Sequence, residues 1–155
     1  MSQKRSGHAS VVLDGKIYAI GGSDGADFLF TVEVYDPQAD SWQRVASMPR
    51  GLCLHAATVL GGKIYVTGGY NQGSTLNSAL VYDPQADAWA QLASMGTFRR
   101  LHASAAVGGK LYVFGGRGAF GGRFSTAEVY DPASDSWAQV SSLTPARSHL
   151  AAAAL

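Results

Sequence analysis

The chain has 155 residues, of which 46% are hydrophobic and 15% charged, and its formal net charge is +1. This composition excludes a disordered tail, and the near-neutral charge gives no specific indication of nucleic-acid binding. No run of about 18 apolar residues is present, and residues 1–5 (MSQKR) enter the first repeat without a hydrophobic signal segment, so we expect no membrane association.

A short stretch recurs three times, as residues 16–22 (KIYAIGG), 63–69 (KIYVTGG) and 110–116 (KLYVFGG). Each copy is a run of β-branched and aromatic residues that ends in a glycine doublet, which is typical of a buried strand followed by a tight bend. The copies lie 47 residues apart. A fixed period of about 40 to 50 residues indicates a propeller or a solenoid, in which each repeat is one structural unit.

Two turn signals divide the first repeat into short strands. Asp14 and Gly15 predict a two-residue hairpin turn, because both central positions of such a turn take positive φ. Residues 36–40 (DPQAD) predict a second turn, since proline fixes φ and both aspartates bond nearby backbone N–H groups. We therefore expect a loop over residues 23–30 and four antiparallel strands, over residues 9–13, 17–20, 31–35 and 41–45.

The second and third repeats copy this plan, and the third carries one extra residue in the loop after its glycine doublet. We predict one domain over residues 1–155, with no linker inside it. Its repeat units are expected over residues 5–48, 49–97 and 98–146. Residues 147–155 would start a fourth repeat, with a strand over residues 151–155.

A glycine doublet after the second strand, a tyrosine on the third and a tryptophan on the fourth recur in register three times. Together they resemble the kelch repeat, and the resemblance covers residues 5–155. It implies an all-β fold, a kelch-type β-propeller in which each repeat forms one four-stranded blade. The large aromatic side chains are then expected to pack between blades. They are Tyr35, Tyr82, Tyr130, Trp42, Trp89 and Trp137.

Three blades do not surround an axis, since propellers have about 4 to 8 blades. Of these counts only six is a multiple of three, so we expect a homodimer in which two chains close one six-bladed ring about a two-fold axis. Residues 149–155 would either replace residues 8–13 of the partner chain or be surplus. We favour residues 9–13 keeping their place, because the short hairpin ties them to the next strand at little loop-closure cost.

Several patterns that suggest chemistry are better explained by the repeat. Residues 116–121 match a dinucleotide-binding fingerprint, but they lead into a strand rather than a helix. Cys53 has no counterpart and no placed catalytic partner, and as a lone cysteine it slightly favours a reducing compartment such as the cytoplasm. Asp36 and Asp40 recur as turn residues. We therefore expect no catalytic residue, cofactor or metal.

Four histidines recur every 47 residues, which predicts the same point on successive inner strands. Packing or hydrogen bonding encoded by the repeat is the favoured interpretation, and a ring-shaped metal or anion site around the axis is the alternative. These residues are His8, His55, His102 and His149.

Charge is predicted to separate between the two faces of the disc. The face with the short turns carries seven aspartates against Lys16, Lys63 and Lys110, which we expect to be solvated, and its net charge is −4. The opposite face, here called the loop face, is built from the longer loops. It carries seven arginines against Asp24 and Asp27, a net charge of +5. The arginines are Arg5, Arg50, Arg99, Arg100, Arg117, Arg123 and Arg147.

The loop face is also the variable one, because its loops over residues 23–30, 70–77 and 117–125 differ in every copy. Residues that escape the repeat are free to serve a site, and arginine favours bidentate contact with carboxylate or phosphate. Kelch propellers of the ubiquitin-ligase adaptor kind bind acidic peptides here, through the residue after the doublet and those before the first strand. The candidate ligand-binding residues are Ser6, Ser23, Tyr70, Asn71, Arg99, Arg100, Arg117, Arg123, Arg147 and Ser148.

These observations predict a non-catalytic protein- or peptide-binding module that prefers an acidic ligand. Two alternatives stay open. One is a sugar-binding or sugar-modifying propeller, because some kelch relatives are oxidases, epimerases or lectin-like proteins. The other is an engineered or partial repeat array with no selected ligand.

Overall fold

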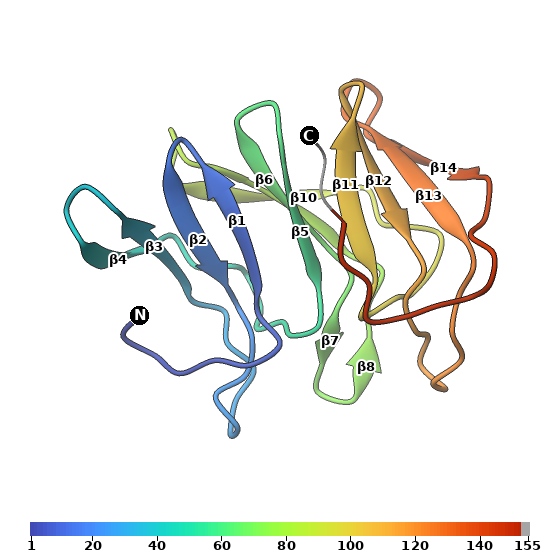
Figure 1. Ribbon diagram of the computed structural model, residues 1–155, viewed down its shortest axis with the longest axis horizontal. Helices are drawn as coiled ribbons and strands as arrows, with labels where there is room; N and C mark the ends of the chain where they lie inside the picture. Colours follow the sequence, from blue (N-terminus) through green and yellow to red (C-terminus); the bar gives the residue numbers. More distant parts are fainter. Residues whose placement is uncertain (153–155) are drawn as a thin grey trace.

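The computed structural model describes residues 1–152, which form three four-stranded antiparallel sheets and one small hairpin (Figure 1). The all-β prediction is therefore confirmed. Among these residues, none lies in a helix long and apolar enough to cross a membrane.

The first sheet contains β1 (Ala9–Leu13), β2 (Lys16–Ile20), β3 (Val32–Asp36) and β4 (Ser41–Val45). The second contains β5 (Ala56–Leu60), β6 (Lys63–Thr67), β9 (Ala79–Asp83) and β10 (Ala88–Leu92). The third contains β11 (Ala103–Val107), β12 (Lys110–Phe114), β13 (Ala127–Asp131) and β14 (Ser136–Val140).

Each sheet pairs its strands in sequence order, as the turn signals predicted. In the first sheet Leu13 pairs with Lys16, and the two residues between them have φ of 50° at Asp14 and 72° at Gly15. Figure 1 shows the three sheets fanned side by side like successive blades, with the short turns toward the top and the longer loops below. We call the sheets blades 1, 2 and 3.

The loop of blade 2 contains an element that was not expected. Residues 70–77 were predicted as a loop, but they include the two-residue strands β7 (Tyr70–Asn71) and β8 (Ser74–Thr75), joined by a turn at Gln72 and Gly73. The strands are too short to show an alternating pattern, so the sequence did not indicate them.

The core lies between the blades rather than within any one of them. From blade 1, Tyr18, Ile20 and Val32 pack against Ile64 and Tyr82 of blade 2, and all five are buried. A second cluster joins blades 2 and 3 around Tyr65, Leu111 and Tyr130. Each blade therefore needs a neighbour to bury its apolar face, as expected for stacked repeats.

Polar contacts that repeat from junction to junction accompany this core. The backbone N–H of Ala46 donates to Asp87 Oδ1 at 2.8 Å, and its carbonyl accepts from Trp89 Nε1 at 2.8 Å. One repeat later, the N–H of Ala93 donates to Asp135 at 2.9 Å and its carbonyl accepts from Trp137 at 2.8 Å. We call this pair of bonds the inter-blade clasp. Trp89 and Trp137 thus pack between blades as predicted, but their hydrogen bonds to the preceding blade were not foreseen. Trp42 packs on Tyr35 of its own blade.

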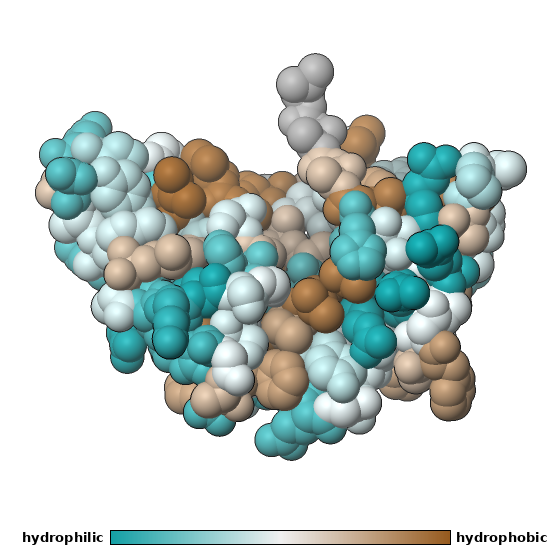
Figure 2. Space-filling model, turned by 60° about the horizontal axis from the view of Figure 1, so that its bottom comes forward, coloured by the Kyte–Doolittle hydropathy of each residue, from teal (hydrophilic) through white to brown (hydrophobic). Residues whose placement is uncertain are grey.

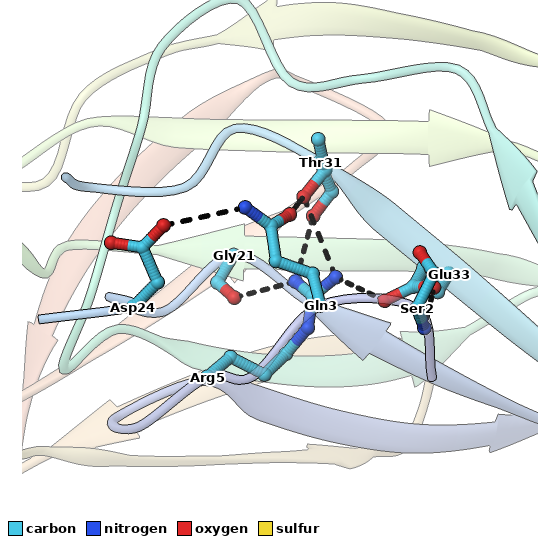
Figure 3. A network of polar contacts seen from close by, with 7 residues as sticks. All are labelled: Ser2, Gln3, Arg5, Gly21, Asp24, Thr31 and Glu33. Carbon is cyan, nitrogen blue, oxygen red and sulfur yellow. Dashed lines mark hydrogen bonds and ion pairs between the residues drawn. The ribbon is translucent and has the colours of Figure 1, made fainter. Parts of the chain in front are cut away.

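A buried ion pair anchors the first blade (Figure 3). Arg5 donates to Glu33 at 2.6 Å, and also to the carbonyl oxygens of Gly21 and Thr31 at 2.7 and 3.1 Å. The N–H and the hydroxyl of Ser2 both donate to the other oxygen of Glu33 at 2.7 Å. Burial alone would raise the pKa of Glu33, but these hydrogen bonds and the charge of Arg5 outweigh it and lower the pKa to about 2.

The third blade repeats this arrangement around Arg99, whose side chain is fully buried. Arg99 donates to Glu128 at 2.7 Å and to the carbonyls of Gly115 and Thr126, while Gly96 N–H donates to Glu128 at 2.6 Å. Arg99 was predicted to bind a ligand on the surface, and this placement corrects that prediction. Its guanidinium is committed to a buried carboxylate and to backbone carbonyls.

The middle blade replaces the whole arrangement with apolar residues. Leu52 and Leu80 stand where blade 3 has Arg99 and Glu128, and each is 1% exposed. Pro49, which has no N–H to satisfy, stands where blade 3 has Gly96. The same fold therefore accepts either a complete charged set or a complete apolar set at this place.

This equivalence predicts how blade 3 responds to substitution. Arg99→Leu alone should cost about 3 to 5 kcal/mol of stability, because it leaves Glu128 charged and buried without its partner. The triple change Gly96→Pro, Arg99→Leu and Glu128→Leu copies the middle blade and should recover most of that loss. Urea unfolding of both variants measures it. A triple variant no more stable than Arg99→Leu would show that the two sets are not interchangeable.

The chain after residue 146 follows the path of a next repeat, one residue out of the expected register. A residue with positive φ precedes the first strand of each repeat, at Gly7, Leu54 and Leu101. The fourth such residue is His149, with φ of 58°, and its N–H donates to Leu101 as Leu101 N–H donates to Leu54. Leu150 therefore takes the place of the histidine, and the predicted equivalence of His149 is wrong.

The cause of this shift is the extra residue in the third loop, which moves all later positions by one. Of the strand expected over residues 151–155, Ala151 and Ala152 are not in a strand, and residues 153–155 lie outside the described residues.

Candidate ligand-binding face

Three predicted site residues that follow the glycine doublets meet the residues that precede the inner strands. Ser23 forms a two-way backbone bridge with Ser6, at 2.8 and 2.9 Å. Tyr70 forms the same bridge with Cys53, at 2.8 and 3.1 Å. Arg117 forms it with Arg100, at 2.8 and 3.0 Å. In each blade, the residue after the glycine doublet and a residue before the inner strand therefore form a short antiparallel ladder on the loop face. We call these the ladder pairs.

Blade 3 alone fills this ladder with positive charge. Arg117 pairs with Arg100 on one side and with Arg123 on the other. Side chains at directly paired antiparallel positions project to the same side, so these three arginines are neighbours. Like charges placed directly opposite one another are destabilising in a ladder. The equivalent pairs of blade 1 join serines and Phe28, so the fold does not require arginine here.

The guanidinium groups of these three arginines keep most of their donors free. Arg100 lies over the ring of Tyr70, with 4.6 Å from Cζ to the ring centroid. Arg117 donates from Nε to the carbonyl of Gly121 at 3.2 Å. Within residues 1–152, Arg100 and Arg123 make no side-chain hydrogen bond, and none of the three arginines is in an ion pair. The half-exposed cluster can therefore accept an anion from solvent.

An aromatic pair borders this cluster. The rings of Phe28 and Tyr70 meet edge to face, with 5.8 Å between centroids. Asn71 donates its side-chain amide to the carbonyl of Gly51, which holds the hairpin of blade 2 against the linker before it. Sequence reasoning missed Phe28, although its place in a variable loop made it a candidate.

The remaining predicted residues lie apart from this cluster. Arg99 is buried, as described above, and Arg5 is paired in the same way. Arg147 is exposed and Ser148 is half-buried. Within residues 1–152 the Arg147 side chain bonds only to the nearby carbonyls of Thr144 and Pro145, both at 3.3 Å. Removing the two buried pairs leaves five arginines against two aspartates, so the net charge of the loop face is +3 rather than the expected +5. Figure 2 brings the loop face forward and shows hydrophilic and hydrophobic side chains interspersed.

The lysines of the opposite face are not simply solvated, as had been expected. Lys16 pairs with Asp36 at 2.9 Å, Lys63 with Asp83 at 2.8 Å and Lys110 with Asp131 at 2.9 Å. Each aspartate also accepts backbone N–H bonds in its own turn. This face is therefore internally paired, in contrast to the free arginines of blade 3.

All four histidines line a hollow of about 170 Å³ beside the inner strands of the three blades. His102 exchanges a hydrogen bond of 2.8 Å with the hydroxyl of Thr67. Burial lowers the pKa of His55 to about 4. Burial, together with the charge of Arg99, lowers the pKa of His102 to about 3. Both side chains are neutral at pH 7, and within residues 1–152 no group of three or more His, Cys, Asp or Glu is placed to hold a metal.

Cys53 is buried beside the ladder of blade 2. Burial raises the pKa of its thiol, although the charge of Arg100 acts in the opposite direction. The thiol is therefore protonated near neutral pH, which does not favour a nucleophile.

Comparison with known proteins agrees with this architecture. Residues 1–155 match the family model described as the KLHDC2/KLHL20/DRC7 Kelch-repeats domain. The chain belongs to the kelch-repeat family. Kelch-like protein 35 of Mus musculus is 38% identical over 52 residues, which are 34% of this chain and 9% of that protein. The Kelch repeat and BTB domain-containing protein F47D12.7 of Caenorhabditis elegans is 48% identical over 50 residues, 32% of this chain and 9% of that protein.

A third similar protein has a name that does not mention the kelch repeat. Beta-scruin of Limulus polyphemus is 34% identical over 53 residues, 34% of this chain and 6% of that protein. In all three cases the matched stretch is about one repeat long and spans less than a tenth of the relative. These likenesses show the repeat, and the activities of the whole relatives do not carry over with it.

The buried histidines predict a pH dependence of stability. Both stay neutral in the folded chain but take up a proton below about pH 6.5 when unfolded, so stability should fall as the pH drops from 6.5. The slope that each contributes should be about 0.7 kcal/mol per pH unit at pH 6.5 and should approach about 1.4 kcal/mol per pH unit near pH 5.

Urea unfolding across this range checks the prediction. His55→Gln and His102→Gln should each flatten the dependence, whereas the matched change at exposed His149 should leave it unaltered. The same slope in all three variants would contradict the assignment.

Proposed function

We propose that this kelch chain is a non-catalytic protein-binding module that takes an acidic ligand on the loop face of blade 3. The observation that carries the proposal is the row of three adjacent arginines, Arg100, Arg117 and Arg123. Neither the repeat nor the core needs them, and their mutual repulsion favours a bound anion. Their guanidinium groups suit carboxylates, which they bind in a bidentate geometry.

The neighbouring aromatic residues suit a peptide ligand. Arg100 lies over the ring of Tyr70 in a cation–π contact, which restricts its side chain before a ligand binds. The conformational entropy that Arg100 loses on binding is therefore smaller. Phe28 and Tyr70 add an apolar surface beside the charge. Kelch proteins generally serve as binding modules without catalysis, and one of the relatives named above is a kelch-like protein. An acidic peptide with an apolar residue is therefore the ligand that fits this surface.

Direct binding measurements test the site. Arg100→Ala with Arg117→Ala should weaken binding of a short polyglutamate peptide by at least about tenfold, because each arginine supplies charged hydrogen bonds. The matched control, Lys4→Ala with Arg44→Ala, removes the same charge from exposed positions elsewhere and should have little effect. Titration calorimetry at low salt measures both. Equal binding by the two double variants would refute the assignment, and turnover of any sugar would refute the non-catalytic role.

Thermal stability gives an independent readout. A polyanion that relieves the repulsion among these arginines should raise the melting temperature. The gain should shrink as salt rises, because the Debye length falls from about 30 Å at 0.01 M to about 10 Å at 0.1 M.

Two further changes control for effects on stability alone. Asp36→Ala and Asp83→Ala on the opposite face should lower stability through lost turn bonds and leave the anion-induced gain unchanged. A gain that does not depend on salt would contradict the electrostatic origin.

A further inference from the structure

The two junctions inside the chain are built alike. Tyr18 of blade 1 packs against Tyr82 of blade 2 with 6.1 Å between ring centroids. Tyr65 of blade 2 packs against Tyr130 of blade 3, also at 6.1 Å. The inter-blade clasp accompanies each contact. A junction therefore consists of a tyrosine pair and a clasp, and within residues 1–152 the outer faces of blades 1 and 3 each present half of such a junction.

The open end of blade 1 presents the groups that make the clasp elsewhere. Asp40 corresponds to Asp87, but among residues 1–152 its side chain accepts a hydrogen bond only from its own Tyr35, at 2.6 Å. Trp42 corresponds to Trp89, yet within residues 1–152 its indole N–H makes no hydrogen bond. Ile17 beside them is 38% exposed. This end carries the same side chains as the interior junctions, but the backbone N–H and carbonyl that they bond there have no counterpart beside it within residues 1–152.

The open end of blade 3 presents the matching receptor. A hollow of about 400 Å³ lies on its outer face, lined mainly by apolar side chains. Tyr112 lies there at the position of Tyr18 and Tyr65, and Ser141 lies at the position of Ala46 and Ala93. Val107 beside them is 60% exposed. No side chain within residues 1–152 bonds the backbone N–H of Ser141 as Asp87 bonds that of Ala46.

We propose that blade 1 of a second copy docks on the open face of blade 3. Tyr35 of the second copy would pack on Tyr112, and its Asp40 and Trp42 would form the clasp on the backbone of Ser141. The occupant is a second copy because this chain carries both halves of the junction, and each continues an interface already present twice in the chain. Two-fold symmetry makes the contact twice and closes a six-bladed ring.

The segment after residue 146 now occupies the place that docking needs. Gly116 N–H donates to Arg147 at 2.9 Å, and His149 N–H donates to Leu101 at 2.9 Å. At the interior junction the next blade makes these bonds, from Gly22 N–H to Leu52 and from Leu54 N–H to Gly7. Residues 5–8 of a docked copy would need the same partners. The C-terminal segment and the second copy therefore compete for one place.

Of the two competing segments, we expect the C-terminal segment to be displaced and residues 5–13 to stay in place. Arg5 is held by the buried ion pair and by two backbone carbonyls, and β1 pairs with β2 along all five of its residues. Within residues 1–152 the Arg147 side chain reaches only the carbonyls of Thr144 and Pro145. The backbone bonds that hold the C-terminal segment to Gly116 and Leu101 are ones that residues 5–8 of a docked copy can replace. Loosening the C-terminal segment should therefore promote docking, while β1 keeps its place.

Sedimentation equilibrium of the full chain tests the proposal. The chain should associate reversibly to twice its mass. Trp42→Phe, which removes only the indole N–H, should weaken association about tenfold, because one hydrogen bond is lost at each of two contacts. Trp89→Phe removes the same group from the interior junction and should leave association unchanged. Urea unfolding verifies that both variants are folded.

A change in the C-terminal segment provides the second arm. Leu150 packs on Gly115, and Leu150→Asp should release the segment and strengthen association, whereas Ala151→Asp, at an exposed residue, should not. A mass of one chain at all concentrations, for both the full chain and Leu150→Asp, would overturn the proposal. Equal weakening by Trp42→Phe and Trp89→Phe would also overturn it, because association would then use another surface.

Discussion

The inter-blade clasp is the contact on which the rest of the structure depends. In each clasp, an aspartate accepts a hydrogen bond from the N–H of one alanine in the preceding blade, and a tryptophan donates to the carbonyl of the same alanine. Two hydrogen bonds to one residue fix both the distance and the rotation between successive blades. The apolar clusters around Tyr82 and Tyr130 lie at the same two junctions.

This regular frame explains why the loop face can differ from blade to blade. The ladder pairs at Ser6, Cys53 and Arg100 are all joined by backbone bonds, to which only the Ser6 pair adds a side-chain bond within residues 1–152, so the fold accepts different side chains there. Blade 1 fills them with small residues, blade 2 with a tyrosine and a buried thiol, and blade 3 with arginines. Charge concentrated in one blade, on a scaffold that does not need it, is the physical basis for the ligand site that we propose.

The buried charges show a different use of the repeat. Glu33 with Arg5, and Glu128 with Arg99, are complete sets in which the carboxylate is bonded on both oxygens. The middle blade removes every member together. A buried charge without its partner is costly, so these positions change as a group or not at all.

The sequence was sufficient for the four strands of each blade, because Asp14 with Gly15 and each glycine doublet mark the bends between them. It did not indicate the hairpin of β7 and β8. It was not sufficient for Arg99, since an arginine in a polar linker has the same local pattern whether it faces solvent or a buried glutamate. Pairing Arg99 with Glu128 spans 29 residues and needed the fold. His149 misled because a 47-residue spacing matched by chance, after an insertion had shifted the true register to Leu150.

Part of the site was predictable from the sequence. The residues after the doublets could be named from the repeat, and the structure brings them to the ladder with the residues before the inner strands. Which of them are neighbours could not be named. Arg123 pairs with Arg117 because the loop of blade 3 folds back on itself. Phe28, in the loop of blade 1, contacts Tyr70 in the loop of the neighbouring blade 2.

Hydrogen exchange of the three indole N–H groups, followed by NMR at increasing protein concentration, tests the central claim most directly. The account predicts that Trp89 and Trp137 are protected at every concentration, because each already donates to the preceding blade. Trp42 should exchange freely in dilute protein and become protected as copies associate. Trp42 that remains unprotected while the chains associate would contradict the claim that the clasp joins one copy to the next.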